Sequence, residues 1–138
     1  MENINKLICY LLAIANFAKD IHYTCRGEAF YTKHLLADRI YNGLYDFTDR
    51  IKETCLLGND ILPLPSGEYL AMAMNLLPAP EQNDKKNFEH MQKLLIDCLV
   101  LMQEMLQDEG TPRAEVSLID GIAQDLQQKL GLVNLQVK

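Results

Sequence analysis

Apolar residues recur at every third or fourth position through most of the chain, which is the spacing of amphipathic helices. The first periodic stretch predicts a helix over 3–22, and Gly27 then interrupts the pattern. The second stretch predicts one long helix over 28–57, ending at Gly58-Asn59, a helix stop signal. At about 30 residues this helix would be roughly 45 Å long and would span the domain.

Two more helices are predicted in the second half of the chain, over 84–107 and over 111–131. Thr111 followed by Pro112 is a typical helix start, with a capping hydroxyl and a proline in the first turn. The connection over 58–83 contains a shorter apolar pattern, which predicts a short helix capped by Ser66. The apolar residues of this pattern are Leu70, Ala71, Met74 and Leu77.

No alternating strand pattern of useful length interrupts these helices, so the predicted fold class is all-α. Four helices with one long crossover between the second and the third have the topology of a ferritin-like four-helix bundle. At 138 residues, the whole chain (1–138) is expected to form a single ferritin-like domain.

Composition narrows the class of protein further. The chain is 49% hydrophobic and 23% charged, as in a packed globular protein, and its net charge is −6. This charge argues against DNA or RNA binding through bulk positive charge. The apolar stretch 7–18 is shorter than the roughly 20 residues of a membrane span and has no cleavage site after it, so we expect a helix of a cytoplasmic protein. The four cysteines, without CxxC spacing, are interpreted as reduced core thiols: Cys9, Cys25, Cys55 and Cys98.

Four possible metal ligands follow one another along the predicted second helix. His34 and Asp38 are four residues apart, and so are Asp49 and Glu53, so each pair can present two ligand groups on one helix face. All four fall within an arc of about 100° around a straight helix. However, the two pairs are separated by roughly 16 Å along the axis. They cannot bind the same ion within one chain.

The two pairs are symmetric about a point between Gly43 and Leu44. Two copies of the helix that cross antiparallel at this point would bring each histidine–aspartate pair opposite the partner's aspartate–glutamate pair, in a two-fold dimer with two identical sites. Gly43 would let the two backbones approach closely. His22, on the inward stripe of the first helix, could complete each site. Mixed imidazole and carboxylate ligands suit Fe²⁺, Zn²⁺ or Mn²⁺ better than Ca²⁺ or Mg²⁺.

The segment His22–Tyr31 (HYTCRGEAFY), followed by the four ligands above, resembles the Dps-type miniferritins. That family carries a His-Trp-x-x-x-Gly-x-x-Phe stretch at the end of its first helix, with the ferroxidase ligands at the spacings found here. The resemblance implies that His22, His34 and Asp38 come from one subunit, and Asp49 and Glu53 from its neighbour. It also implies oxidation of Fe²⁺ by hydrogen peroxide or O₂, storage of ferric iron in a hollow dodecamer, and protection against oxidative stress.

The chain departs from the family in two respects that bear on function. Tyr23 stands where the family has tryptophan, so a phenol takes the place of the indole ring. Basic residues near the ends are few (Lys6, Lys129 and Lys138), so we do not expect DNA binding. A 24-subunit ferritin is not favoured, because no Glu-x-x-His pair is present to build a di-iron site within one bundle.

Simpler interpretations stand beside the metal site. His22 alone could be a hydrogen-bonded core histidine, and each carboxylate alone could be solvated surface. The shared spacing and the two-fold symmetry favour a metal site. The alternative function is a non-enzymatic dimeric helical scaffold or interaction protein, with relic ligands or a structural zinc in place of iron. His90 is expected on the surface, and the methionines in the core. Acidic residues near the last helix either line an iron pore or are solvated: Glu109, Glu115, Asp120 and Asp125.

Overall fold

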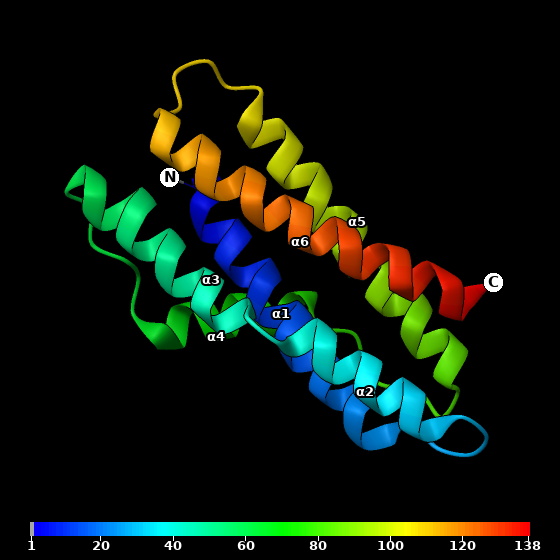
Figure 1. Ribbon diagram of the computed structural model, residues 1–138. Coiled ribbons are helices and arrows are strands. Elements are labelled where there is room, and N and C mark those ends of the chain that lie inside the picture. The colour runs from blue at the N-terminus through cyan, green and yellow to red at the C-terminus, as the bar shows by residue number, and fades with distance from the viewer. Residues whose placement is uncertain (1) are drawn as a thin grey trace.

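The computed structural model describes residues 2–138, and all regular secondary structure in these residues is helical (Figure 1). The elements are α1 (Glu2–Thr24), α2 (Phe30–Tyr41), α3 (Leu44–Ile51), a π-helical turn η1 (Lys52–Leu56), a 3-10 turn η2 (Leu57–Asn59), α4 (Ser66–Leu76), α5 (Asp84–Leu106) and α6 (Arg113–Val137). The four bundle positions are taken by α1, by α2 with α3, by α5 and by α6. The short helix α4 lies in the crossover. The predicted architecture is confirmed.

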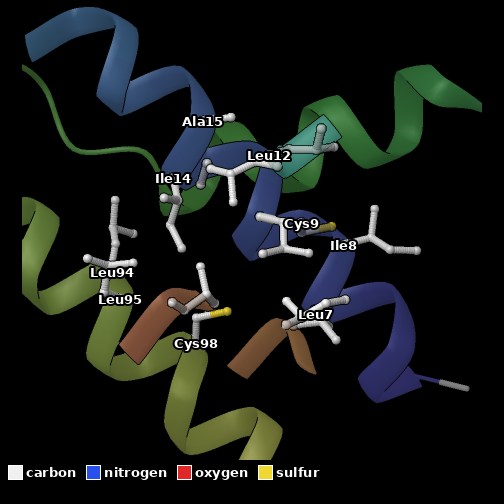
Figure 2. Close-up of a cluster of buried hydrophobic side chains, with 14 of the residues drawn as sticks. Leu7, Ile8, Cys9, Leu12, Ile14, Ala15, Leu94, Leu95 and Cys98 are labelled. Carbon is white, nitrogen blue, oxygen red and sulfur yellow. The ribbon is translucent and has the colours of Figure 1, made fainter. Parts of the chain in front are cut away.

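Helix α1 is the centre of the packing, in contact with α2, α3, α4 and α5. Its buried residues cover almost its whole circumference, and Leu11, Ile14 and Phe17 are fully buried. Figure 2 shows side chains of α1 and α5 meeting in this core, with Cys98 of α5 among them. Each fully buried large apolar side chain contributes about 1.5–3 kcal/mol to folding. The burial of these side chains confirms the inward apolar stripe predicted for this helix.

The predicted continuous helix over 28–57 is wrong, because it breaks in the middle. Asn42 has ψ 130°, and Gly43 has φ +83°, a left-handed conformation that glycine adopts at little cost. The helix ends at Tyr41 and begins again at Leu44, so α2 and α3 are separate segments (Figure 1). Asn-Gly is itself a helix stop signal, and this signal outweighs the apolar periodicity that continues through it.

The apolar residues that predicted the short helix α4 do not form its buried face. Tyr69 and Ala73 are buried, whereas Leu70 and Met74 are 48% and 71% exposed. Ser66 makes no capping hydrogen bond. The face turns because the Tyr69 hydroxyl finds polar partners inside: it donates to Asn5 Oδ1 of α1 at 2.7 Å and accepts from the Leu64 amide at 3.2 Å. A buried tyrosine usually requires such a partner.

The ends of the last two helices follow local chemistry. Asn83 caps α5, and its side chain accepts a hydrogen bond from the Lys86 amide at 2.9 Å. No side chain caps α6, which begins after Pro112, so the predicted Thr111 cap is wrong. The predicted end at Gly131 is wrong as well. The helix continues to Val137, with Val133 fully buried beyond the glycine.

Several single-residue predictions can be compared with the structure. All four cysteines are buried and free, as predicted. Phe30 belongs to the apolar stripe that predicted the helix over 28–57, but it is 47% exposed, because it lies where the chain turns into α2. Met72 and Met74 are exposed rather than in the core, and Met1 lies outside the described residues. Glu115 is buried, and its carboxylate accepts a hydrogen bond from Asn59, so it is not a solvated surface residue of this chain.

Candidate metal centre

His22 and His34 lie side by side where α1 ends and α2 begins. The intervening turn contains Gly27 at φ +79° and Ala29 at φ +60°, and these left-handed residues fold the chain back on itself. The two imidazole rings stack, with centroids 3.5 Å apart and planes 25° from parallel. Two residues that are twelve positions apart in the sequence therefore form one pair.

Reciprocal hydrogen bonds to the backbone fix the orientation of both rings. His34 Nδ1 lies 2.7 Å from the carbonyl oxygen of His22, and His22 Nδ1 lies 3.1 Å from that of His34. A carbonyl oxygen only accepts, so each Nδ1 carries the hydrogen and donates it. In a neutral imidazole the lone pair is then on Nε2. Metal-binding histidines are held in the same way, by a hydrogen bond from the nitrogen that does not bind the metal.

Asp38 follows His34 by one turn on α2 and adds a carboxylate to the same end of the molecule. Its Oδ1 lies 3.8 Å from the ammonium of Lys19, which itself sits over the ring of Tyr41 at 4.1 Å. Both charged side chains are partly exposed. The carboxylate is thus already paired with a cation, which a metal ion bound to Asp38 would have to displace.

Asp49 and Glu53 lie beyond the helix break, and both are exposed. Asp49 is in α3, and Glu53 is in the π-helical turn η1, an element that occurs frequently at functional sites. Within residues 2–138, no three histidine, cysteine, aspartate or glutamate side chains come together as a metal-binding group. The chain brings the two histidines together, and leaves the other pair of carboxylates apart.

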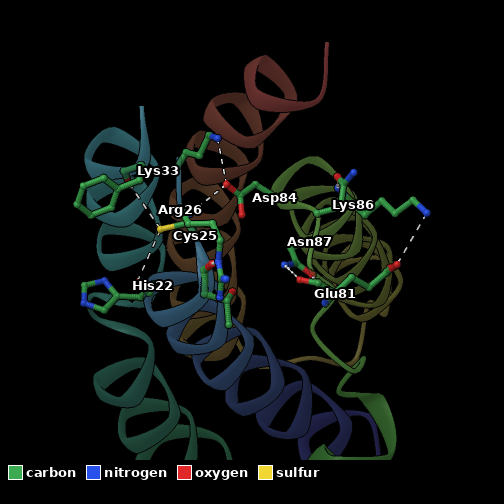
Figure 3. A network of polar contacts seen from close by, with 11 residues as sticks. His22, Cys25, Arg26, Lys33, Glu81, Asp84, Lys86 and Asn87 are labelled. Carbon is green, nitrogen blue, oxygen red and sulfur yellow. Dashed lines mark hydrogen bonds and ion pairs between the residues drawn. The ribbon is translucent and has the colours of Figure 1, made fainter. Parts of the chain in front are cut away.

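A polar network supports the turn between the two histidines (Figure 3). The Cys25 thiol lies 3.8 Å from the carbonyl oxygen of His22 and 3.6 Å from that of Phe30. Asp84, at the start of α5, accepts from the Arg26 amide at 3.3 Å and pairs with Lys33 at 3.1 Å. Burial, and then the nearby Asp84 charge, raise the pKa of the Cys25 thiol. This thiol is a packed structural group.

Some residues around the histidine pair were not predicted from the sequence. Lys19 precedes His22 by three positions, and this helical spacing could have revealed it. The exposed ring of Tyr31 lies nearly parallel to that of His34, at 6.3 Å, which no sequence signal indicated. His90, expected on the surface, is half-buried, and its Nε2 lies 2.6 Å from Glu81 Oε2. It takes no part in this site.

A solved structure with the same arrangement of helices is the F47E mutant of Dps1 from Mycobacterium smegmatis. The two superpose with a TM-score of 0.79 over 99% of this chain and 93% of that one, at 10% sequence identity. The chain has the Dps-type ferritin-like fold. At this identity the Dps likeness establishes the fold alone. No protein-family model matches the chain, and no curated protein does either.

The Dps-type fold accounts for the architecture described above, including the short helix in the crossover. It confirms the fold that the His22–Tyr31 segment implied. The five ligands carried over from the resemblance stay a prediction. No helix among residues 2–138 has the length and apolar character needed to cross a membrane.

Proposed function

We propose that this protein oxidises Fe²⁺ with hydrogen peroxide at a site shared between two subunits and stores the ferric product in a homo-oligomeric cage. The proposed ligands are His22, His34 and Asp38 of one subunit, with Asp49 and Glu53 of its partner. The observation that carries the proposal is the stacked histidine pair, in which each Nδ1 is bound to a backbone carbonyl and each Nε2 is left free for a metal.

The ligand types suit iron as substrate. Imidazole nitrogen binds Fe²⁺, and carboxylates favour the ferric product. In the proposed reaction two Fe²⁺ ions each give one electron to hydrogen peroxide, the O–O bond breaks, and two protons are taken up to yield two water molecules. O₂ is the alternative oxidant. The chain's own contribution is to orient the histidines and to add carboxylate charge beside them.

The proposed assembly begins with a two-fold dimer centred on Gly43. Leu35 on α2 and Tyr45 on α3 lie on either side of this glycine, and they are 48% and 45% exposed. A dimer would bury these apolar side chains. Twelve chains would then form the cage. We place the protein, as one domain over residues 1–138, in the cytoplasm, where its four buried thiols would stay reduced.

The test is anaerobic loading with Fe²⁺ followed by hydrogen peroxide, monitored by ferric absorbance. The double variant His34→Ala, Asp49→Ala should oxidise iron only at the buffer rate. The matched control is His90→Ala, Asp46→Ala, which removes the same residue types outside the site and should retain the wild-type rate. Size-exclusion chromatography with light scattering should show a cage of about twelve wild-type chains.

The same measurements can refute the proposed ferroxidase function. If the wild type also oxidises iron only at the buffer rate and elutes as a dimer, the Dps-type fold serves a non-enzymatic scaffold. A rise in melting temperature with Zn²⁺, without any peroxide consumption, would then indicate a structural zinc.

A further inference from the structure

Lys129 of α6 binds the backbone at the break between α2 and α3. Its Nζ donates to the carbonyl oxygen of Asn42 at 2.8 Å. Among the hydrogen bonds of residues 2–138, this is the one that joins the backbone of Asn42 and Gly43 to a helix other than α2 and α3. The others link the break only to its own flanking helices, through Asp38 and Phe47.

The Lys129 ammonium is buried, which is unusual for lysine. Its side chain is 5% exposed and pairs with the Asp125 carboxylate at 2.8 Å. Lysine is almost never fully buried unless it is paired. The C-terminal end of a helix carries partial negative charge, and a cation there can bind the last carbonyl oxygens. Lys129 therefore caps the end of α2 from a neighbouring helix.

The position of this contact matters for the site proposed above. The break separates His34 and Asp38 on one side from Asp49 and Glu53 on the other. In a two-fold dimer the angle between α2 and α3 decides whether one subunit's histidine end meets the partner's carboxylates. Any change of this angle acts on both sites of the dimer at once.

We propose that Lys129 is a positioning residue, which holds α2 and α3 at the angle that lets the two halves of the metal site meet. This inference rests on the proposed function. Lys129 touches neither the metal nor the oxidant. It acts through the Asn42 carbonyl oxygen, and Asp125 neutralises its charge inside the bundle.

The test uses Co²⁺ as a probe of the site, by calorimetric titration and by its visible absorption, which reports coordination geometry. Lys129→Met keeps the length of the side chain and removes the ammonium. We expect Co²⁺ binding about tenfold weaker, as for other supporting residues of metal sites, and a shifted visible band. The matched control is Lys93→Met, which removes an exposed lysine whose Nζ is also 2.8 Å from an aspartate. It should bind Co²⁺ as the wild type does.

The variant His34→Ala separates failure of this inference from failure of the proposed function. If His34→Ala binds Co²⁺ like the wild type, the metal site itself is refuted. If His34→Ala loses Co²⁺ while Lys129→Met keeps the wild-type affinity and spectrum, only the role of Lys129 is refuted. Weaker binding in Lys129→Met together with loss of the dimer would also refute it, because assembly alone would explain the result. If Lys129→Met does not fold, Lys129→Gln takes its place with the same expectation.

Discussion

The two halves of the proposed site differ in how far the chain prepares them. At the histidine end, two rings are stacked at 3.5 Å, both are held by backbone carbonyls, and the turn between them is tied to α5 through Asp84. At the carboxylate end, Asp49 and Glu53 are exposed, and no group of three possible metal ligands forms among residues 2–138. The histidine end is ordered before any metal or partner arrives.

This difference determines which half of the site would lose more conformational entropy when a metal binds. Groups that are already oriented lose little conformational freedom when they bind a metal, whereas exposed carboxylates lose rotamer freedom at that moment. The histidine end would therefore bind first, and assembly with a second subunit would complete the ligand set. Each variant below, apart from the control Lys93→Met, carries a change at one end of the site only.

The largest effect is expected from placing the two defects in different chains. His34→Ala alone and Asp49→Ala alone should each reduce peroxide-driven Fe²⁺ oxidation to the buffer rate. When the two variants are mixed as unfolded chains and refolded together, half of the dimers contain one of each chain. Each such dimer has one intact site, so about a quarter of the wild-type rate should return. The measurement is ferric absorbance after peroxide addition.

The control is the same two proteins, refolded separately and mixed afterwards. They should stay inactive for as long as the subunits do not exchange. If each site were complete within a single chain, neither mixture would recover Fe²⁺ oxidation. That result would contradict a site shared between the histidine end of one subunit and the carboxylate end of another.

An intermediate effect is expected behind the carboxylate end, at Cys55. Burial, and then the Glu115 carboxylate, raise the pKa of this thiol to about 12, from an ordinary value of 9.0. The folded state thus holds the proton that the unfolded chain releases above pH 9, so the free energy of unfolding should fall between pH 9 and 12. Cys55→Ala should reduce this fall in urea unfolding without abolishing it, because burial also raises the pKa of the Cys98 thiol. The expected cost of the substitution at pH 7 is about 1 kcal/mol.

Cys25→Ala is the companion variant from the histidine end. Burial raises the pKa of the Cys25 thiol as well, but without the large shift found for Cys55. The loss of unfolding free energy at alkaline pH should therefore change less in this variant. Equal flattening by both variants would show that the two ends are equally well packed behind their ligands.

The smallest effect is expected at the ion pair between Lys33 and Asp84, beside the turn that joins α1 to α2. Lys33→Met removes the ion pair between Lys33 and Asp84, whose side chains are 21% and 16% exposed, and should lower the free energy of unfolding by about 0.5 kcal/mol. Lys93→Met removes a shorter ion pair, 2.8 Å against 3.1 Å, but one whose lysine is 76% exposed. It should cause no measurable change, because solvent screens the pair. A larger loss for Lys93→Met would show that distance outweighs burial.

Much of the fold follows from apolar periodicity, and its failures have physical causes. The ends of α1 and α5 lie within two residues of the predicted ones, because long amphipathic patterns leave little choice. The break at Asn42-Gly43 was missed because the apolar stripe resumes in phase after it. The face of α4 was missed because a tyrosine with two internal hydrogen bonds can replace leucine in a core.

The candidate site was accessible from the sequence only in part. Spacing alone placed His34 one turn from Asp38, and inward spacing suggested that His22 would lie nearby. The reciprocal carbonyl bonds of the two rings depend on left-handed residues in the turn, and Ala29 at φ +60° has no sequence signature. The Lys129 contact spans 87 residues, a distance over which periodicity carries no information.

The burial of α1 has a consequence for how this protein can evolve. The central helix faces other helices on nearly every side, so most substitutions in it act on stability. Apolar groups that a second subunit could cover lie elsewhere, at Leu35, Tyr45, Leu70 and Met74. Selection on folding and selection on assembly therefore fall on different residues. Lineages that keep the same bundle can change their quaternary structure without redesigning its core.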